Sequence, residues 1–518
     1  MNYEIVMGLE VHVELATKTK IFCGCSTEFG GEPNSHVCPV CMGLPGSLPV
    51  LNKEVVNCAI KAGLALNCNI QKENRFDRKN YFYPDLPKDY QISQLYHPIC
   101  RNGYMDINVD GESSRITLCE IHMEEDAGKL VHDAGGTLVD YNRCGVPLIE
   151  IVTNPDFRNA KQVVAFLENL QQMLRYLDVS DCKMQEGSMR ADVNLSVRPI
   201  GAEQFGTRTE MKNLNSFKAI QRAIEFESKR QMELVEAGGI VTQETRRWDD
   251  ETGESYAMRS KENAQDYRYF PDPDLLPVLL QEEWICRLRN RMPELPMEKK
   301  ERYQKQLGLS EDIAKTIIAV KQIAELFESA AAKSGEAKLA ANFIVGDVLR
   351  LLKERGVEPE NISIDPKKLA AVITMTEEGK INRNVAKQVI EEVFDHNTDP
   401  VQYVREKGLL AIENLEMIQK AVDEAISENP KSIEDYKSGK QKAFGFLVGQ
   451  AMRKLSGKAS PQTINKLVQE KLQKIQYVAI EEQEKRKRQK KQLKLRNMML
   501  KNGILQLMIV NRTDVTER

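Results

Sequence analysis

Ionisable and apolar side chains alternate in the strand-like segment that follows Gly8. Leu9, Val11, Val13 and Leu15 share one face of such a strand, so Glu10, His12 and Glu14 share the opposite face. Residues 122–129 (HMEEDAGK) form a second acidic stretch, and Glu150, Asp192 and Glu210 are isolated acids in further strand-like segments. Glu150 stands alone in an apolar run, where an ionised carboxylate is unfavourable unless it meets a cation or hydrogen-bond donors.

Carboxylate oxygens that converge with one imidazole can bind Mg²⁺ or a similar hard cation, and such an ion can bridge phosphate oxygens. For any single acid, exposure to solvent or pairing with Arg75, Arg78 or Arg190 is the simpler explanation. The whole set, taken with His12, favours a metal site. The sequence contains no Gly-x-x-x-x-Gly-Lys-Ser/Thr loop and no Gly-x-Ser-x-Gly elbow. Motifs alone therefore do not assign the use of ATP.

Four cysteines form two short pairs in Gly- and Pro-rich surroundings, Cys23 with Cys25 and Cys38 with Cys41. Two facing turns that each carry two thiolates can complete a tetrahedral Zn²⁺ site. Incidental thiols and disulfides are the alternatives, and disulfides are disfavoured in an intracellular chain. We expect a structural zinc ion, because four sulfur ligands leave no open coordination position.

Aromatic and cationic residues are interleaved in residues 76–85 (FDRKNYFYPD) and again in residues 266–271 (DYRYFP). This composition suits contacts to bases or phosphates, although cationic side chains packed on aromatic rings would explain it equally well. A second basic region covers residues 437–474, with 9 basic residues and one acid, a net charge of +8. Within it, an expected helix carries Lys442, Gly445, Gly449 and Arg453. Helix packing would explain the two glycines, but the charge favours contact with an RNA backbone.

The elements that must position these residues change character near Pro293. All 11 cysteines precede it, and the segment before it reads as strands and loops with helices at 160–176 and 217–236. Helical periodicity dominates beyond the proline-containing linker 291–296. Helices are expected there at 297–307, 311–332, 337–353, 366–375, 382–394, 415–428, 439–455 and 461–474. We predict an α+β fold with a large antiparallel sheet (1–292), an all-α helical domain (293–400), a small helical tail domain (401–476) and a basic extension (477–518).

Composition agrees with a cytoplasmic protein that has no membrane segment. The 518 residues are 41% hydrophobic and 29% charged with a net charge of −3, and no run approaches the ~20 apolar residues of a membrane span. The N-terminus shows no basic segment followed by an apolar run. The extension 477–518 has 11 basic and 5 acidic residues, or +6. It is expected to be either a solvated, partly helical tail or a basic arm that contacts RNA.

Several long motifs together resemble one family, the B subunit of the bacterial aspartyl/glutamyl-tRNA amidotransferases. The resemblance covers residues 1 to about 476, and the extension has no counterpart in it. The motifs that carry it are GLEVHVEL (8–15), DRKNYFYPD (77–85), HMEEDAGK (122–129), KNLNSF (212–217), DYRYFP (266–271) and KAFGFLVGQ (442–450).

The resemblance implies a cradle domain with the catalytic site, a helical domain and a tRNA-binding tail domain, in a heterotrimer with an amidase A subunit and a small C subunit. It implies that the chain binds misacylated Glu-tRNA(Gln) or Asp-tRNA(Asn) and uses ATP and Mg²⁺ to phosphorylate the side-chain carboxylate. Ammonia from glutamine would arrive through an internal channel. The alternative is a zinc-stabilised tRNA-binding adaptor with no catalytic step of its own.

The resemblance also implies roles for particular residues. It places catalysis and magnesium binding at Glu10, His12, Glu125 and Glu150, with Asp192 and Glu210 as further magnesium ligands. Zinc would be bound by Cys23, Cys25, Cys38 and Cys41. Nucleotide contacts are expected at Lys79, Ser188, Arg190 and Lys212, and RNA contacts at Lys442, Gly445, Gly449 and Arg453.

Overall fold

In a computed structural model, the chain forms two compact units, Met1–Tyr303 and Gln304–Arg518. The structure describes residues 3–133, 135–260, 267–411, 415–455 and 458–513. Within these described ranges, strands occur in the first unit and the second is helical, which confirms the α+β class. The division falls within helix α5 (Pro296–Lys305), which starts at the end of the linker 291–296. The finer limits at 400 and 476 stay predictions.

A nine-stranded sheet forms the centre of the first unit, in the order β14-β13-β12-β11-β1-β10-β7-β6-β2. Neighbouring strands are antiparallel except for the parallel pair β12 and β13, so the predicted antiparallel sheet is confirmed with one exception. The strands are β1 (Tyr3–Glu14), β2 (Asn69–Ile70), β6 (Cys100–Val109), β7 (Glu112–Glu125), β10 (Pro147–Thr153), β11 (Met189–Pro199), β12 (Thr209–Lys212), β13 (Glu244–Asp249) and β14 (Glu254–Ser260).

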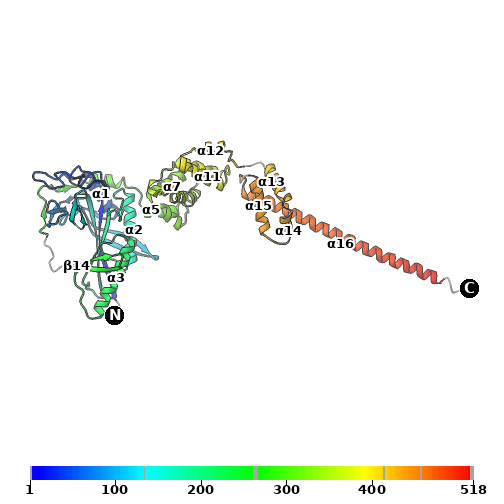
Figure 1. The fold of residues 1–518 in the computed structure, drawn as a ribbon, viewed down its shortest axis with the longest axis horizontal. Coiled ribbons are helices and arrows are strands. Elements are labelled where there is room, and N and C mark those ends of the chain that lie inside the picture. Colours follow the sequence, from blue (N-terminus) through cyan, green and yellow to red (C-terminus); the bar gives the residue numbers. More distant parts are fainter. Residues whose placement is uncertain (1–2, 134, 261–266, 412–414, 456–457, 514–518) are drawn as a thin grey trace. The chain divides into compact units, whose positions relative to one another are not determined.

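Helices pack on one face of this sheet and leave the other face polar. On β1, Leu9, Val11 and Val13 are fully buried in the core shared with helices α1 (Lys53–Ala65), α2 (Ala160–Tyr176) and α3 (Phe217–Glu236). The helices α2 and α3 have the predicted bounds, because the side chains of Asn159 and Ser216 cap their first turns. Figure 1 shows both helices beside the sheet.

A three-stranded sheet in the order β15-β4-β5 joins the two aromatic and cationic segments. In it, β4 (Asp77–Asn80) lies between β5 (Tyr90–Ser93) and β15 (Phe270–Pro271), with Arg78 paired to Phe270. The remaining pairs are β3 (Glu73–Asn74) with β16 (Val278–Leu279), and β8 (Lys129–Asp133) with β9 (Gly136–Asp140). Helix α4 (Glu282–Arg289) precedes the linker.

The second unit begins with helices whose bounds differ from expectation at two places. The helix expected at 311–332 is two helices, because Val320 adopts an extended conformation between α6 (Glu311–Ile318) and α7 (Lys321–Ser334). The helix expected at 337–353 contains a π-helical turn, Ile344–Val348, between α8 (Ala337–Phe343) and α9 (Leu349–Arg355). After a short 3₁₀ turn (Pro359–Asn361) follow α10 (Pro366–Glu377), α11 (Arg383–His396) and α12 (Pro400–Glu406), the last not expected.

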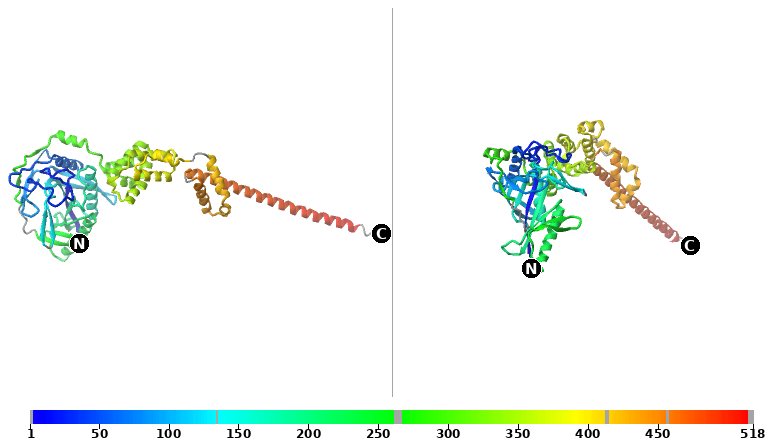
Figure 2. Two further views of the ribbon diagram at one scale, coloured as in Figure 1. Left: turned by 45° about the horizontal axis from the view of Figure 1, so that its top comes forward. Right: turned by 60° about the vertical axis from the view of Figure 1, so that its left-hand side comes forward.

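Four more helices build a separate core near the C-terminus: α13 (Leu415–Ser427), α14 (Pro430–Lys437), α15 (Lys442–Lys454) and α16 (Pro461–Thr513). Val422, Leu447 and Val468 are fully buried in that core. Helix α16 is 53 residues long and continues far beyond the expected end at 474 (Figure 2). Among the described residues, no helix combines the length and the apolar character needed to cross a bilayer.

Candidate active site

Strand register gathers the predicted ionisable residues on the polar face of the large sheet. Glu10 pairs with Asp192, and His12 pairs with Glu150, across the antiparallel ladders that flank β1. Glu150 in turn pairs with His122 on β7. Directly opposed residues in a sheet project to the same side. The side chains of β7, β10, β1, β11 and β12 therefore meet on the face that the helices leave open.

The first group of ligating atoms consists of His12, Glu124 and Glu150, whose donor atoms lie within 4.8 Å of one another. His12 Nε2 is 3.4 Å from Glu150 Oε2 and 3.7 Å from Glu124 Oε1. His122 Nε2 is 3.1 Å from Glu150 Oε2 and 3.8 Å from Glu124 Oε2. One imidazole with two carboxylates is a donor set suited to a divalent cation. His122 is a second imidazole that contacts the Glu150 carboxylate.

Electrostatics ties these side chains together. Burial opposes ionisation of Glu150, but the neighbouring His122 and His12 outweigh it and hold the pKa of Glu150 well below its usual range. Burial alone would lower the pKa of His12, yet its hydrogen bond with Glu150 and the charge of Glu124 raise the pKa. The pKa of His122 is likewise raised by Glu150 against the effect of burial. The carboxylate that looked isolated in the sequence is thus ionised between two imidazoles.

The second group consists of Glu10, Asp192 and Glu210, with donor atoms also within 4.8 Å. Lys212 Nζ lies 2.6 Å from Asp192 Oδ2 and 3.0 Å from Glu210 Oε1. Asn194 donates a hydrogen bond of 3.0 Å to Glu10. The pKa of Glu10 is raised, first by burial and then by repulsion from Glu150 and Glu210. The group carries more negative charge than its neighbours neutralise, and a divalent cation would relieve that excess.

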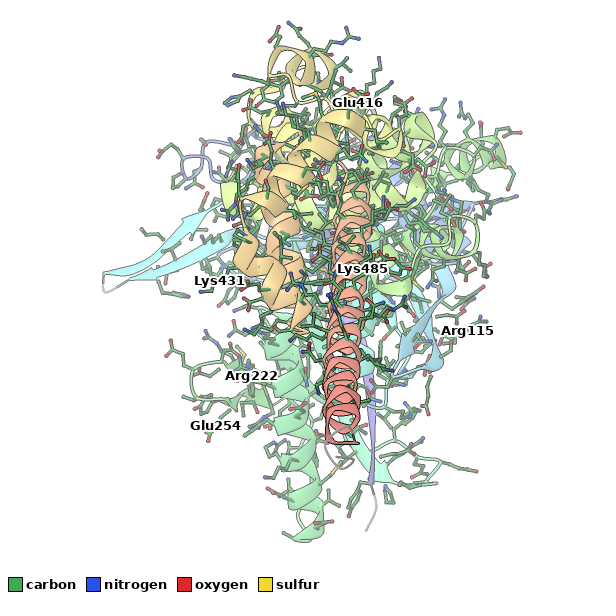
Figure 3. All side chains as sticks on the ribbon, turned by 90° about the vertical axis from the view of Figure 1, so that its right-hand side faces the viewer. Arg115, Arg222, Glu254, Glu416, Lys431 and Lys485 are labelled. Atoms are coloured by element: carbon green, nitrogen blue, oxygen red, sulfur yellow. The ribbon has the colours of Figure 1, made fainter. Side chains whose placement is uncertain are left out.

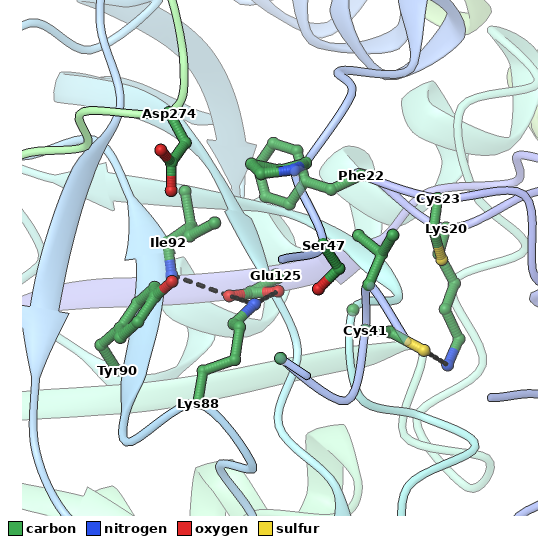
Figure 4. Close-up of a pocket in the computed structure, with 14 residues that line it drawn as sticks. Lys20, Phe22, Cys23, Cys41, Ser47, Lys88, Tyr90, Ile92, Glu125 and Asp274 are labelled. Atoms are coloured by element: carbon green, nitrogen blue, oxygen red, sulfur yellow. Dashed lines mark hydrogen bonds and ion pairs between the residues drawn. The ribbon is translucent and has the colours of Figure 1, made fainter. Parts of the chain in front are cut away.

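Glu125, which was expected to bind magnesium, belongs to neither group. Glu124 occupies the position in the first group that was expected for Glu125. Successive residues of β7 alternate between the two faces, so Glu124 shares the polar face with His122 while Glu125 points the other way. Its carboxylate lies 2.5 Å and 2.6 Å from Lys88 Nζ and accepts a hydrogen bond from the Ile92 amide (Figure 4). Alternation counted from His122 along HMEE was the signal in the sequence that distinguishes the two acids.

The four expected nucleotide contacts are placed differently from one another. Arg190 and Lys212 lie on the polar face, with Arg190 2.9 Å from Asp126 and Lys212 on the second group. Lys79 Nζ lies 5.1 Å from the ring centre of Tyr267. Ser188 precedes β11 and its hydroxyl is bound to Asp181 at 2.5 Å. Among the four, Lys212 contacts the second group and Arg190 pairs across the strands with His12 of the first.

Three tyrosines from the aromatic and cationic segments meet edge to face beside the first group. The rings of Tyr81 and Tyr267 are 5.8 Å apart, and those of Tyr267 and Tyr269 are 6.1 Å apart. Burial raises the pKa of Tyr269, and the charges of Glu124 and Glu150 raise it further. The rings therefore border the same polar region as the carboxylates, a place where a base or sugar could stack.

A pocket opens beside Glu10 on the same face of the sheet. Its lining includes Gly8, Glu10, Asn194, Ser196 and Arg208. Arg208 and Ser196 were not singled out in the sequence, since neither belongs to a patterned motif. A cavity that combines a guanidinium with hydrogen-bonding side chains next to a cation-binding group can accommodate a phosphorylated ligand.

The four predicted zinc ligands converge, with their sulfur atoms within 4.8 Å of one another. All four are free thiols, and the Sγ atoms of Cys38 and Cys41 are 3.9 Å apart. Sulfurs at Zn–S distances of about 2.3 Å in a tetrahedron lie about 3.8 Å apart, so the set fits zinc. A hydrogen bond from Cys23 lowers the pKa of Cys41 to about 4, aided by the Cys38 amide and the Lys20 ammonium. Figure 4 shows Lys20 directed at Cys41.

The expected RNA-binding residues share one exposed face of α15. Lys442, Gly445, Gly449 and Arg453 recur at helical spacing and are all exposed. A Cβ atom built on Gly445 or Gly449 would meet nothing within 4 Å. Neither glycine therefore serves packing against a neighbouring helix within the described residues. They leave bare backbone on the surface between two cationic side chains.

Comparison with known proteins agrees with this geometry. Residues 5–286 match the family described as GatB/GatE catalytic domain, and residues 325–472 match the GatB domain. The chain is 57% identical over 480 residues to the B subunit of the aspartyl/glutamyl-tRNA(Asn/Gln) amidotransferase of Caldicellulosiruptor bescii, covering 92% of this chain and 100% of the relative. It is 52% identical over 479 residues to the protein of the same name from Carboxydothermus hydrogenoformans, covering 92% and 100%.

The chain is thus a subunit of a ligase of the glutamine-dependent tRNA amidotransferase class. Within that class it belongs to the family of B subunits of the aspartyl/glutamyl-tRNA(Asn/Gln) amidotransferases. The resemblance on which the sequence motifs converged is confirmed. As a B subunit, the protein functions within a complex of several subunits in protein biosynthesis.

Proposed function

We propose that this subunit binds misacylated Glu-tRNA(Gln) or Asp-tRNA(Asn) and uses ATP to phosphorylate the side-chain carboxylate of the attached amino acid. The single observation that carries the proposal is the pair of ligating groups on one sheet face, His12-Glu124-Glu150 and Glu10-Asp192-Glu210. Glu10 of one group and His12 of the other are two residues apart on one strand face, so their Cα atoms are about 7 Å apart. That spacing suits a site in which two anionic substrates meet.

Chemistry explains why such a face is needed. A carboxylate oxygen is a poor leaving group, whereas phosphate leaves readily from an acyl phosphate. The substrate carboxylate attacks the γ-phosphorus of ATP and ADP departs; ammonia then attacks the acyl carbon and releases phosphate, forming the amide. A bound Mg²⁺ would offset the repulsion between the carboxylate and the triphosphate.

The residues of this chain have separate tasks in the proposal. His12, Glu124 and Glu150 would hold one magnesium ion, and Glu10, Asp192 and Glu210 would hold a second. Lys212 would attract phosphate oxygens beside Asp192 and Glu210, and Arg190 would do so next to His12, which it pairs with across the strands. The pocket lined by Asn194 and Arg208 is the candidate place for the nucleotide. The tyrosines 81, 267 and 269 would stack on a base of the acceptor end.

The cysteine site has a supporting role. Zinc held by Cys23, Cys25, Cys38 and Cys41 would fix the loop that carries them against the pocket in which Lys88 and Glu125 lie, because Cys23 and Cys41 border that pocket. The proposed assembly is a cytoplasmic heterotrimer with an amidase A subunit that releases ammonia from glutamine and a small C subunit. An internal channel would keep the ammonia unprotonated.

The experiment is to purify the complex with its neighbouring subunits and supply ATP, Mg²⁺ and glutamine. Glu-tRNA(Gln) and Asp-tRNA(Asn) are tested separately, with correctly charged Glu-tRNA(Glu) as the control. We expect ADP, phosphate and amidated tRNA in equal amounts with at least one misacylated tRNA. Binding of that tRNA without ADP formation would instead support the adaptor that has no catalytic step.

A further inference from the structure

The C-terminal part of α16 lies outside both family matches, the second of which ends at residue 472. Helix α16 is anchored in the tail core by Ile464, Val468 and Leu472, which are almost completely buried. From residue 476 to residue 498, every side chain that the structure describes is exposed. Figures 1 and 2 show that this exposed part continues the anchored part without a break. The exposed part is therefore held to the tail core by a single continuous helix.

The exposed part carries a run of positive charge that its own helix does not balance. Eight of the twelve residues from Lys485 to Arg496 are Lys or Arg, and no Asp or Glu occurs between Lys485 and Thr513. At 1.5 Å per residue the run is about 18 Å long. Figure 3 shows Lys485 on this helix. In the described part of the extension, the ion pair found is Arg488 with Glu484 at 3.8 Å, and both side chains are largely exposed.

The positive charges of this helix lie at spacings that bring them close to one another. Like charges occur four residues apart at Arg486 and Lys490, at Lys487 and Lys491, and at Lys490 and Lys494. Such pairs destabilise an isolated helix, and a helix that is charged around its whole circumference needs ion pairs or a partner. A polyanion with charges repeated along its length would relieve this repulsion.

We propose that residues 485–496 of α16 form an arm that binds the phosphate backbone of the tRNA substrate. RNA is favoured over an acidic protein or a membrane because this segment is continuous with the tail domain, whose residues 437–474 carry +8. Charges on all sides of the helix suit electrostatic attraction without base recognition. This inference rests on the proposed function, which makes a tRNA the substrate.

The test uses the complete complex with its partner subunits and a labelled misacylated tRNA. One variant changes six residues, 485–488, 490 and 491, to Gln, which preserves helix propensity while removing charge. A matched control changes the exposed Leu493 and Leu495 to Gln and keeps every charge. Dissociation constants are measured from 50 to 300 mM salt.

We expect the charge variant to bind tRNA about tenfold more weakly at low salt, with a salt slope smaller by about two to three, as loss of three to four phosphate contacts requires. The Leu control should match the parent. An unchanged dissociation constant and slope in the charge variant would overturn the inference. Loss of tRNA binding in the Leu control alone would also overturn it and would indicate a protein partner. Binding of the parent complex to vesicles of anionic phospholipid, with tRNA binding unaffected by the charge variant, would overturn it in favour of a membrane.

The same complexes distinguish this inference from the proposed function. At saturating tRNA the charge variant should amidate at the parent's rate, since the arm lies outside the sheet face. If the parent itself forms no ADP with any misacylated tRNA, the proposed function fails, whereas a lost salt slope in the variant would still support an RNA-binding arm.

Discussion

The imidazole Nε2 of His122 lies 3.1 Å from Oε2 of Glu150 on the adjacent strand, and His12 Nε2 approaches the same oxygen to 3.4 Å. Glu150 lies on β10, which is paired with β1 on one side and β7 on the other, so it stands between the two histidines. The lone acid of this strand therefore faces a polar region. There, His122 and His12 hold the pKa of Glu150 well below its usual range.

Glu124, not Glu125, should control the magnesium requirement. Replacing Glu124 with Gln removes a charged oxygen from the first ligating group, whereas the Glu125 carboxylate is held by Lys88 on the opposite face. We expect Glu124→Gln to raise the Mg²⁺ concentration for half-maximal tRNA-dependent ATP turnover by at least about tenfold.

Glu125→Gln is the matched comparison, because the two positions are adjacent and the chemical change is identical. Its Mg²⁺ requirement should equal the parent's, whatever happens to the maximal rate. A Mg²⁺ requirement that shifts with Glu125 but not with Glu124 would contradict the placement of the two acids.

The cysteine site should contain one zinc ion that stabilises the first unit. Because Cys38 and Cys41 each supply a sulfur to the group, Cys38→Ser is expected to lower the zinc content from about one per chain to near zero and to lower the melting temperature by several degrees. Elemental analysis and thermal unfolding measure both. Cys286→Ser, at a cysteine outside the group, serves as the control and should leave both unchanged. A parent protein that contains no zinc and melts at the same temperature as Cys38→Ser would rule the site out.

Period-two alternation predicted a large part of this site from the sequence. It grouped Glu10 with His12 on β1, and cysteine spacing alone indicated the four converging sulfurs. It did not predict which acids from β7, β10, β11 and β12 would reach them, because that depends on strand order and register, and β1 pairs with residues more than 100 positions away on β10 and β11. His122 was missed for this reason, since its partner Glu150 lies on another strand.

Helix positions followed the same logic. Side-chain caps at Asn159 and Ser216 made the ends of α2 and α3 predictable. The break at Val320 was not, because residues 311–332 keep a helical pattern across it, although Val320 itself is extended. The length of α16 was also unexpected, since few apolar contacts support its distal part.

Glu227 provides a pH-dependent test of the scaffold. Its carboxylate is buried and accepts hydrogen bonds from Thr209, Arg230 and Gln231. Burial raises its pKa, but these bonds prevail and the pKa is lowered. Since the folded-state pKa lies below the unfolded value of about 4.3, the stabilisation is complete above that value and is lost as the pH falls through the folded pKa.

Glu227→Gln should therefore lower the free energy of unfolding by about 1–3 kcal/mol at pH 7, and the difference from the parent should shrink below pH ~4. Urea titrations in the background of a Trp284→Phe variant follow the fluorescence of Trp248, which packs on Phe226 of the same helix as Glu227 and reports on this region. A difference that is constant from pH 7 to pH 3.5 would refute the assigned shift.

The exposed backbone at Gly449 on α15 should contribute to tRNA binding and not to the stability of the fold. Because nothing lies within 4 Å of a Cβ at Gly449, Gly449→Leu introduces no clash and improves helix propensity. We expect an unchanged or higher melting temperature together with tRNA binding weakened by about tenfold, since the new side chain blocks close approach of the RNA backbone. Filter binding with labelled tRNA measures the effect. Normal affinity in this variant would move the RNA contact away from this face.

ADP formation that depends on misacylated tRNA tests the central claim most directly. The complete complex is compared with its Glu150→Gln variant at saturating ATP and Mg²⁺, with the tRNA dissociation constant measured on the same preparations. We predict that the variant loses at least about 100-fold in ADP formation, because several kcal/mol of charge stabilisation are removed, while the dissociation constant changes less than about twofold. ADP formation at the parent's rate in Glu150→Gln would contradict the account.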